Sequence, residues 1–376
     1  MTASVSAVEI LRELVAIPSP SSVSNLPLLN WVEDFLKPRG WQVERLPYED
    51  EGGVAKANLI ARPAAGSQTS VIDFAFVCHT DTVPYASNWP DALSLEVRAG
   101  QLHGCGSCDV KGSLACFLAA ASASTSFVPG IALILTADEE IGCKGMDRLL
   151  SRTSLRIGSA IVSEPTNLRP GIAGKGYGLA RITVEGREAH SAFPQQGVSA
   201  ISIAARLIAK IEDTLSQTVQ NSSSDHLFDP PRTTLNIGVI EGGTAKNVIP
   251  GRCTFLAEWR ALPGEDPSGV LTQLHTLIQE ARQAQPDAKI HLDALRAEAG
   301  FSPVSGGTLQ QRLASLLPGE PVGISFGSEA SRVARIADEV IVIGPGDMRT
   351  AHSDRECVPE TELEEWTRVL IDLIRG

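Results

Sequence analysis

Apolar and polar residues alternate in a way that divides the chain into three parts. In the first part, short apolar runs typical of buried strands alternate with helix-like segments, and this order predicts an open α/β sheet with helices on both faces. The predicted strands are residues 71–77, 131–135 and 160–162, and a helix rich in Ala and Leu is predicted from Lys111 to about Ala123. Each strand is followed closely by His, Asp or Glu residues.

The middle part has a different pattern, with apolar residues at alternate positions as in half-exposed strands. Four such strands are predicted, centred on Ile182, Ile237, Ala257 and Leu292. Amphipathic helices are predicted near 198–208 and over 266–281, the second opened by an Asp-Pro pair. The order strand, helix, strand, strand, helix, strand predicts a ferredoxin-like α+β domain inserted into the larger domain.

The α/β pattern returns after this insert. Residues 340–343 are a predicted strand, and a last helix carries a buried stripe of Leu363, Trp366, Leu370 and Leu373. We therefore predict that residues 1–174 and 295–376 form one mostly parallel α/β domain and that residues 175–294 form the insert. A chain of 376 residues is long enough for two such cores.

Composition and charge narrow the classes of function. Hydrophobic residues make up 43% of the chain and charged residues 20%, which is typical of a globular protein. The net charge of −12, with no basic block, argues against a nucleic-acid partner. No apolar run approaches the roughly 20 residues that cross a bilayer, so no membrane partner is expected. The N-terminus, with Glu9, Arg12 and Glu13, predicts an amphipathic helix rather than a signal peptide, and a cytoplasmic location follows.

The cysteines fit the same compartment. Seven of them, an odd number without disulfide-rich spacing, are typical of a reducing environment. One Cys-x-x-Cys run joins Cys105 and Cys108, and it could form a redox couple or half of a structural zinc site. Because no second such pair exists, we favour a packing role for both thiols beside Asp109.

Candidate ligands for metal ions follow the predicted strands. Side chains at the carboxyl ends of parallel strands face a common crevice, so we expect these groups to converge. They are His79, Asp81, Asp109, Glu139, Glu140, Glu164 and His352. Each has an ordinary alternative, such as a core histidine, a helix cap or an acidic loop. No ordinary structural role accounts for two imidazoles and five carboxylates gathered in one place. Together they predict a site for a pair of divalent ions such as zinc.

The neighbouring glutamates suggest a division of roles. If Glu140 binds a metal ion, Glu139 remains free but close, which is the position of a general base that acts on a metal-activated water. Asp81, two residues after His79, could orient the imidazole. The alternative for the glutamate pair is a solvated acidic loop.

With these motifs the sequence resembles, over nearly its whole length, the family of co-catalytic dizinc amidohydrolases that includes aminoacylases and glutamate carboxypeptidases. The resemblance implies two divalent ions, zinc with cobalt as an alternative. One ion would be bound by His79 and Glu164, the other by Glu140 and His352, with Asp109 as the bridging carboxylate. It also implies that Asp81 supports His79 and that Glu139 is the catalytic base.

The insert carries further family-like segments. Residues 186–191 resemble the segment whose histidine, here His190, reaches across a dimer and stabilises the oxyanion in the partner's site. The resemblance therefore implies a homodimer formed through the insert, which would act as a dimerisation and lid domain. Residues 242–250, with Asn247, and Arg260 resemble segments that bind the substrate backbone and carboxylate. From the residues alone, His190 could be a plain turn histidine, and Arg260 could be a surface residue or a planar carboxylate clamp.

Within the family, residues 136–140, 163–166 and 344–352 most resemble the acetylornithine deacetylase branch. Residues 326–330 share this likeness and make Ser328 and Glu329 candidate substrate contacts. The implied reaction is hydrolysis of an N-acyl amino acid, with N-acetylornithine cleaved to ornithine and acetate in arginine biosynthesis. The alternatives are a succinyl-diaminopimelate desuccinylase, a deacylase of another substrate such as acetylcitrulline, a dipeptidase, or a non-catalytic binding protein that keeps the fold.

Overall fold

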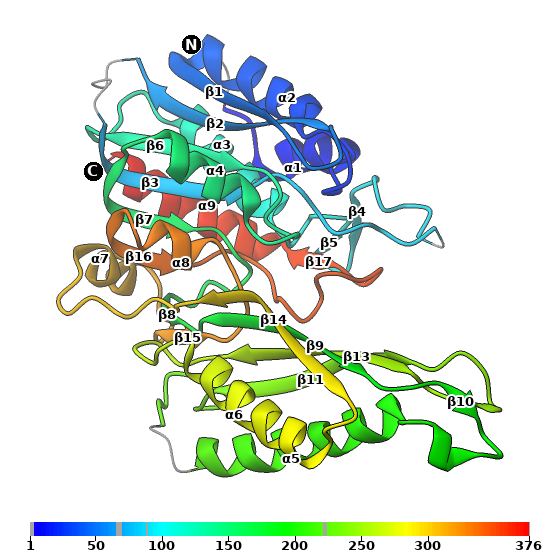
Figure 1. Cartoon of the computed structure of the whole chain (residues 1–376). Coiled ribbons are helices and arrows are strands. Elements are labelled where there is room, and N and C mark those ends of the chain that lie inside the picture. The colour runs from blue at the N-terminus through cyan, green and yellow to red at the C-terminus, as the bar shows by residue number, and fades with distance from the viewer. Residues whose placement is uncertain (1–3, 65–69, 88, 221–223, 376) are drawn as a thin grey trace. The chain divides into compact units, whose positions relative to one another are not determined.

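The chain divides into two compact units, which are described separately. The computed structural model describes residues 4–64, 70–87, 89–220 and 224–375. The first unit contains the residues up to Ile172, Pro303–Val322 and the residues from Ser328 on, and the second contains Ala173–Ser302 and Gly323–Gly327 (Figure 1). The boundary expected after residue 294 falls inside β14 (Lys289–Glu298), because the last residues of this strand still pair with β9 (Tyr177–Glu185).

The first unit is built on an eight-stranded sheet with the order β1-β2-β6-β3-β7-β16-β8-β15. Its strands are β1 (Trp41–Glu49), β2 (Ala55–Pro63), β3 (Val71–His79), β6 (Ile131–Thr136), β7 (Arg156–Val162), β8 (Gly171–Gly174), β15 (Val322–Ile324) and β16 (Ala337–Val342). The central strands β6, β3, β7 and β16 are parallel. Every residue of β6 is buried, as expected for a parallel strand covered on both faces.

Helices cover both faces of this sheet, as predicted. In Figure 1, α4 and α8 lie in front of the sheet, and α3 and α9 lie behind it. The helices are α1 (Ala7–Ala16), α2 (Leu26–Leu36), α3 (Lys111–Ala123), α4 (Lys144–Arg152), α7 (Thr308–Leu316), α8 (Ala330–Val333) and α9 (Glu360–Arg375). Helix α3 has the predicted bounds and is buried over most of its surface, because it packs against α1, α9 and β3.

The N-terminal helix confirms the predicted amphipathic pattern. Ile10, Leu11 and Leu14 of α1 are buried, and Ser6 and Glu9 form a capping box at its start. In the described part of the chain, no helix combines the length and the apolar character needed to cross a membrane.

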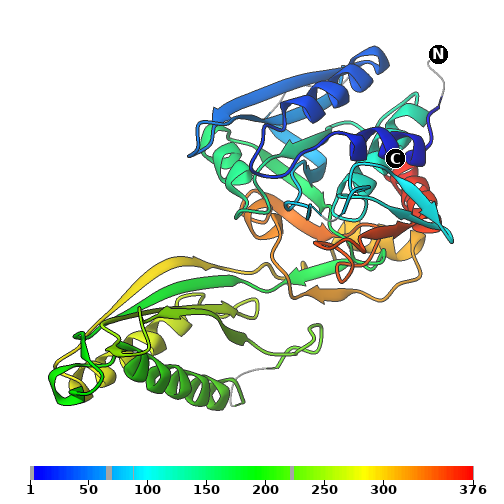
Figure 2. The ribbon, with the colours of Figure 1, turned by 90° about the vertical axis from the view of Figure 1, so that its right-hand side faces the viewer.

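The second unit has the predicted order of elements. Its sheet is antiparallel, with the order β11-β13-β9-β14, and its two helices lie on the same face (Figure 2). The remaining elements are β10 (Ala189–His190), α5 (Ala200–Gln220), β11 (Thr234–Gly242), β12 (Val248–Ile249), β13 (Arg252–Arg260) and α6 (Gly269–Ala284). Helix α6 begins later than predicted, because the Asp266 side chain accepts a hydrogen bond from the N–H of Ser268 in a turn before the helix.

Several elements were not predicted from the sequence, among them α2, α4, α7 and α8, and two further features bear on the site. One is the antiparallel pair β1 and β2 at the edge of the large sheet. The other is a small sheet with the order β17-β5-β4, made of β4 (Glu96–Arg98), β5 (Gln101–His103) and β17 (Cys357–Pro359). The small sheet joins the segment that follows His352 to the segment that precedes Asp109.

Candidate metal centre

The register of the central strands brings the predicted ligands together. Val77 of β3 pairs with Val162 of β7, and His79 and Glu164 each follow two residues later. Because the two strands are parallel, both side chains reach the same edge of the sheet. On the other side of β3, His79 pairs with Thr136 at the end of β6, and the glutamate pair follows.

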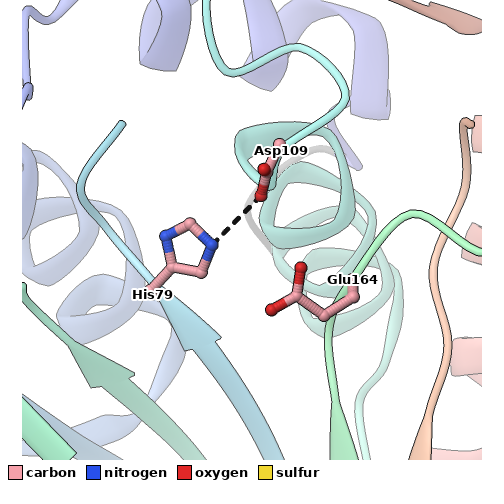
Figure 3. A group of neighbouring side chains, drawn as sticks. All are labelled: His79, Asp109 and Glu164. Atoms are coloured by element: carbon pink, nitrogen blue, oxygen red, sulfur yellow. Dashed lines mark hydrogen bonds and ion pairs between the residues drawn. The ribbon is translucent and has the colours of Figure 1, made fainter. Parts of the chain in front are cut away.

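The first group of ligand candidates consists of His79, Asp109 and Glu164 (Figure 3). All three residues are buried. Asp109 lies in the loop before α3, and its Oδ1 is 3.1 Å from Nε2 of His79. The three ligand atoms lie within 4.8 Å of one another.

The second group consists of Asp109, Glu140 and His352. His352 lies in the loop before β17, and its Nε2 is 3.1 Å from Oδ2 of Asp109 and 3.2 Å from Oε2 of Glu140. Asp109 therefore belongs to both groups, with one carboxylate oxygen facing each imidazole. The five ligands that the resemblance implies are all present in these two groups, whereas Asp81 and Glu139 belong to neither.

The residues fit a pair of divalent ions. Each group offers one imidazole nitrogen and carboxylate oxygens, a donor set that also occurs in catalytic zinc sites. The shared Asp109 matches the geometry of a bridging carboxylate. In addition, Oε1 of Glu140 is buried without a hydrogen-bond partner, so this oxygen is available to a cation.

The charges of the site favour the same conclusion. Burial and the neighbouring carboxylates Asp109 and Glu139 raise the pKa of Glu164 well above its usual value. Hydrogen bonds to the carboxylates of Asp109 and Glu140 raise the pKa of His352 to about 10. Burial alone would lower the pKa of His79, but the hydrogen bond to Asp109 raises it well above the usual value. Crowded carboxylates of this kind are costly to bury unless protons or cations neutralise them.

Glu139 lies beside the two groups without belonging to either. Burial, together with the carboxylates of Glu140, Glu329 and Asp81, raises its pKa to about 8, although the charge of His79 acts in the opposite direction. Its Oε1 accepts a hydrogen bond from the thiol of Cys143 at 3.3 Å. A carboxyl group with a pKa near neutrality, close to a metal centre, is suited to take and return a proton.

Asp81 differs from the expectation that its carboxylate faces the His79 ring. The backbone carbonyl of Asp81 is the nearer partner, 2.9 Å from Nδ1 of His79, whereas Oδ1 is 3.8 Å away. The carboxylate instead accepts hydrogen bonds from the N–H of Glu139 at 3.1 Å, the N–H of Glu140 at 3.3 Å and the Ser21 hydroxyl at 2.7 Å. Asp81 therefore holds the turn that carries the glutamate pair.

Ser328 and Glu329, named as substrate contacts, lie at the start of α8. Glu329 is 1% exposed, and its Oε2 accepts a hydrogen bond from the Thr136 hydroxyl at 2.8 Å. Burial raises the pKa of Glu329 to about 7. The Glu329 carboxylate is therefore buried at the carboxyl end of β6 rather than on an open surface. Ser328 is also buried, and its Oγ accepts a hydrogen bond from the N–H of Ala330.

Three predicted site residues belong to the second unit. His190 is exposed on β10, and Asn247 lies next to it, since the carbonyl of Asn247 accepts from the N–H of Ser191 at 3.0 Å. Arg260 ends β13, where its Nε donates to Glu258 at 2.9 Å and its guanidinium lies over the Tyr177 ring. The structure thus places these three residues within one unit and the metal groups within the other.

Several supporting residues were missed from the sequence. Glu356 is buried and accepts hydrogen bonds from three backbone N–H groups around Asp109. Asp138, directly before the glutamate pair, forms a buried ion pair with Lys56 and accepts a hydrogen bond from Tyr48 at 2.9 Å. These partners lie far away in the sequence, so only the adjacency of Asp138 to Glu139 could have indicated one of them.

The Cys105 and Cys108 pair is buried beside this site. Burial and the nearby Glu356 carboxylate raise the pKa of Cys105 to about 11 and that of Cys108 well above its usual value. All seven cysteines are free. Thiols that stay protonated at neutral pH are poor nucleophiles, which favours the packing role over a redox couple.

Comparison with known proteins identifies the family. Residues 172–285 match the family described as the peptidase dimerisation domain. The chain is 40% identical to acetylornithine deacetylase from Myxococcus xanthus, over 96% of this chain and 94% of that protein. The chain belongs to the M20 peptidase family. Membership makes it a hydrolase and confirms the resemblance seen in the sequence. It is also 28% identical to acetylornithine deacetylase from Proteus mirabilis, over 98% of this chain and 96% of that protein.

Solved structures share the M20 fold. A tripeptidase from Staphylococcus aureus has a TM-score of 0.77 and 20% identity, covering 98% of this chain and 97% of that one. A dinuclear metal-binding peptidase of the M20 family from Bacillus subtilis has a TM-score of 0.65 and 14% identity, covering 98% and 96%. These likenesses confirm the predicted fold class, a mostly parallel central sheet with an inserted dimerisation domain.

Proposed function

We propose that the protein is a metal-dependent hydrolase of N-acyl amino acids and that its substrate is N-acetylornithine. The observation that carries the reaction type is Asp109, which lies between two imidazole and carboxylate groups with Glu139 alongside. The substrate rests on the identity with acetylornithine deacetylases along almost the whole chain. Ornithine formed in this way would feed arginine biosynthesis in the cytoplasm, a location that the free cysteines favour.

The residues of the first unit are proposed to bind the metal ions and to transfer the proton. His79 and Glu164 would hold one ion, Glu140 and His352 the other, and Asp109 both. Such ions, when bound, polarise the acyl carbonyl and lower the pKa of a water molecule. The Glu139 carboxylate then takes the proton of the attacking water and later delivers it to the leaving amine nitrogen. Asp81 keeps Glu139 in place through the backbone hydrogen bond.

The residues of the second unit are proposed to bind the substrate. Arg260 and Asn247 would hold the carboxylate of the amino acid, for which the planar guanidinium of Arg260 is well suited. His190 of the partner subunit would donate a hydrogen bond to the oxygen of the acyl carbonyl as negative charge develops on it. This role requires a dimer, and residues 172–285 match the peptidase dimerisation domain.

A substrate panel tests this proposal. The protein would be stripped of metal with a chelator, reloaded with zinc or cobalt, and assayed with N-acetylornithine, N-acetylcitrulline, N-succinyl-diaminopimelate and a set of dipeptides. We expect the highest kcat/KM with N-acetylornithine and no hydrolysis before metal is restored. A higher kcat/KM with dipeptides would replace the proposal with a dipeptidase, the alternative favoured by the similarity to a tripeptidase. Hydrolysis of none of these substrates by the reloaded protein would contradict it altogether.

Glu139→Gln tests the mechanism separately from the substrate. The variant keeps the side-chain size but cannot accept a proton, so kcat should fall by about 10²–10⁴-fold, the usual contribution of a general base. The content of bound metal should remain at two ions per subunit, because Glu139 is outside both ligand groups. Near-normal turnover with both ions bound would remove Glu139 from the role of base.

A further inference from the structure

One carboxylate holds the backbone of the loop that carries Asp109. Glu356 is 3% exposed. Its Oε1 accepts hydrogen bonds from the N–H groups of Cys108 and Asp109, and its Oε2 accepts one from the N–H of Gly106, all at 3.0 Å. A buried backbone N–H group that loses its hydrogen-bond partner is costly to the fold. Three such groups share one Glu356 side chain, which therefore holds residues 106–109 in place.

The same C-terminal segment supplies both a ligand candidate and this contact. His352 faces Oδ2 of Asp109, and Glu356, four residues later, holds the N–H of the same residue. Directly after Glu356, β17 pairs with β5, with Cys357 opposite His103. The segment is therefore anchored on the chain that enters the Asp109 loop.

The loop has a particular need for such an anchor. Gly106 has a φ of +79°, a conformation that only glycine adopts at little cost, and glycine also gives the chain many other conformations. Asp109 has to direct one carboxylate oxygen to each group of ligands. A bridging position of this kind tolerates errors of only about 0.5 Å, so the loop conformation matters for binding.

We propose that Glu356 is a positioning residue of the metal centre, which acts by fixing the backbone of residues 106–109 so that Asp109 can bridge two ions. The inference rests on the proposed function, because it requires Asp109 to bind metal. Glu356 faces the backbone of Asp109 and not its carboxylate, and it belongs to neither ligand group. It acts through Asp109 and does not itself bind the ions.

The test compares the zinc affinity of two variants. Glu356→Gln keeps the size of the side chain but replaces one acceptor oxygen with a donor that opposes a backbone N–H. We expect the zinc affinity of the chelator-stripped protein to fall roughly 10- to 100-fold, as it does when residues that support metal ligands are changed. The affinity would be measured by competition with a chromogenic chelator. The absorption spectrum of the cobalt-loaded protein should also change, since it reports the geometry around the ion.

Glu339→Gln is the matched control. Glu339 is also buried and accepts two backbone N–H hydrogen bonds, from Leu309 and Gln310 at 2.9 Å, at the start of α7. It lies in the first half of β16, whereas the metal groups follow the carboxyl ends of the strands. This variant should lose thermal stability but keep the zinc affinity and the cobalt spectrum of the wild type.

The possible outcomes separate the two proposals. If Glu356→Gln and Glu339→Gln both lower the melting temperature and both keep wild-type zinc affinity, Glu356 has only a structural role and the inference is wrong. If the wild type itself binds no zinc, the proposed function fails together with the inference. Should Glu356→Gln not fold, Glu356→Asp takes its place. It keeps the charge but is shorter, and a weaker zinc affinity at unchanged secondary structure supports the inference, while an unchanged affinity overturns it.

Discussion

At the scale of single residues, Asp109 couples the two halves of the site. Each of its carboxylate oxygens lies 3.1 Å from a different imidazole, so its position affects both groups of ligands. His79 and His352 each belong to one group only. A small displacement of Asp109 would therefore disturb both groups of ligand candidates, and its backbone N–H is held by the Glu356 carboxylate.

Cys143 gives a prediction about Glu139, the proposed catalytic base. Its thiol donates to Oε1 of Glu139, which fixes the orientation of the carboxylate. Cys143→Ala should lower kcat roughly two- to fivefold, the equivalent of the ~0.5–1 kcal/mol of a weak S–H hydrogen bond, and leave KM unchanged. Cys143→Ser retains a donor and should restore most of the loss. Steady-state kinetics of the two variants would decide the matter, and equal kcat values for Ala and Ser would exclude a hydrogen-bonding role.

Glu329 gives a prediction about pH. Burial raises its pKa from 4.5 to about 7. A carboxyl group whose pKa is raised on folding favours the folded state in its protonated form, so this contribution is complete below pH 4.5 and is lost as the pH rises through about 7. Glu329→Gln imitates the protonated form. It should stabilise the metal-free protein at pH 8, by on the order of 3 kcal/mol, and change little at pH 5.

Urea unfolding of the metal-free variants at the two pH values would measure this difference. The control is Glu51→Gln, because the side chain of Glu51 is 81% exposed and its replacement should change the free energy of unfolding by no more than about 0.5 kcal/mol at either pH. An equal effect of Glu329→Gln at pH 5 and pH 8 would mean that the Glu329 carboxylate titrates near its ordinary pKa.

The ligand candidates could be named from the sequence, but their supports could not. His79, Glu140 and Glu164 each follow a strand-like apolar run, which is a local signal. Glu356 has no such signal, because its partners lie about 250 residues earlier in the chain and its role depends on tertiary contacts. The thiol contact of Cys143 likewise depends on the conformation of the turn after Glu140, which no periodic pattern specifies.

At the scale of elements, the pair β1 and β2 supports the turn that carries Asp138, Glu139 and Glu140. Lys56 of β2 forms an ion pair with Asp138 and donates to the carbonyl of Ser21. Tyr48 of β1 donates to the second oxygen of Asp138. Asp138 itself has a φ of +60°, so the turn before Glu139 adopts a conformation that Asp tolerates better than most residues. The edge of the sheet thus fixes the turn that follows its neighbour β6.

This contact can be tested by removing one partner at a time. Lys56→Met leaves the Asp138 charge buried with one donor fewer, and it should lower the free energy of unfolding by about 3–5 kcal/mol. Tyr48→Phe should cost less, about 1–3 kcal/mol, because it removes a single hydrogen bond to a charged group. Both values come from urea unfolding. In the background of Asp138→Asn the cost of Lys56→Met should shrink, and an undiminished cost would show that the ion pair is not its source.

The predictability of the elements follows their burial. The four strands of the insert were found from apolar residues at alternate positions, and β13 shows the matching alternation of burial most clearly. In β11 a bulge between Ile237 and Val239 interrupts the alternation, and Val239 is 45% exposed. Strand β1 is an edge strand with charged residues on both faces and a proline near its end, so no periodicity marks it. The short strands β4, β5 and β17 have three residues each, too few for any pattern.

At the scale of the whole molecule, the proposed machinery is divided between two units with separate cores. The metal-binding candidates and Glu139 belong to the first unit, and His190, Asn247 and Arg260 belong to the second. His190 is exposed on the short ladder of β10 and β12, and its Nδ1 accepts from the N–H of Ala192 at 3.1 Å. Its Nε2 takes no part in that hydrogen bond and is free to serve a substrate oxygen, which is the role proposed for it in a partner subunit.

Mixing two inactive variants tests whether His190 acts across a dimer. His190→Ala and Glu139→Gln should each be nearly inactive, the first with its metal content unchanged. After unfolding and joint refolding, half of the dimers are hybrids, and one of the two sites in each hybrid combines an intact Glu139 with His190 of the partner subunit. The mixture should therefore recover about a quarter of the wild-type activity, as random assembly of a twofold-symmetric dimer requires. If His190 served the site of its own subunit, every site in the mixture would carry a defect, and the activity would not rise above that of the separate variants.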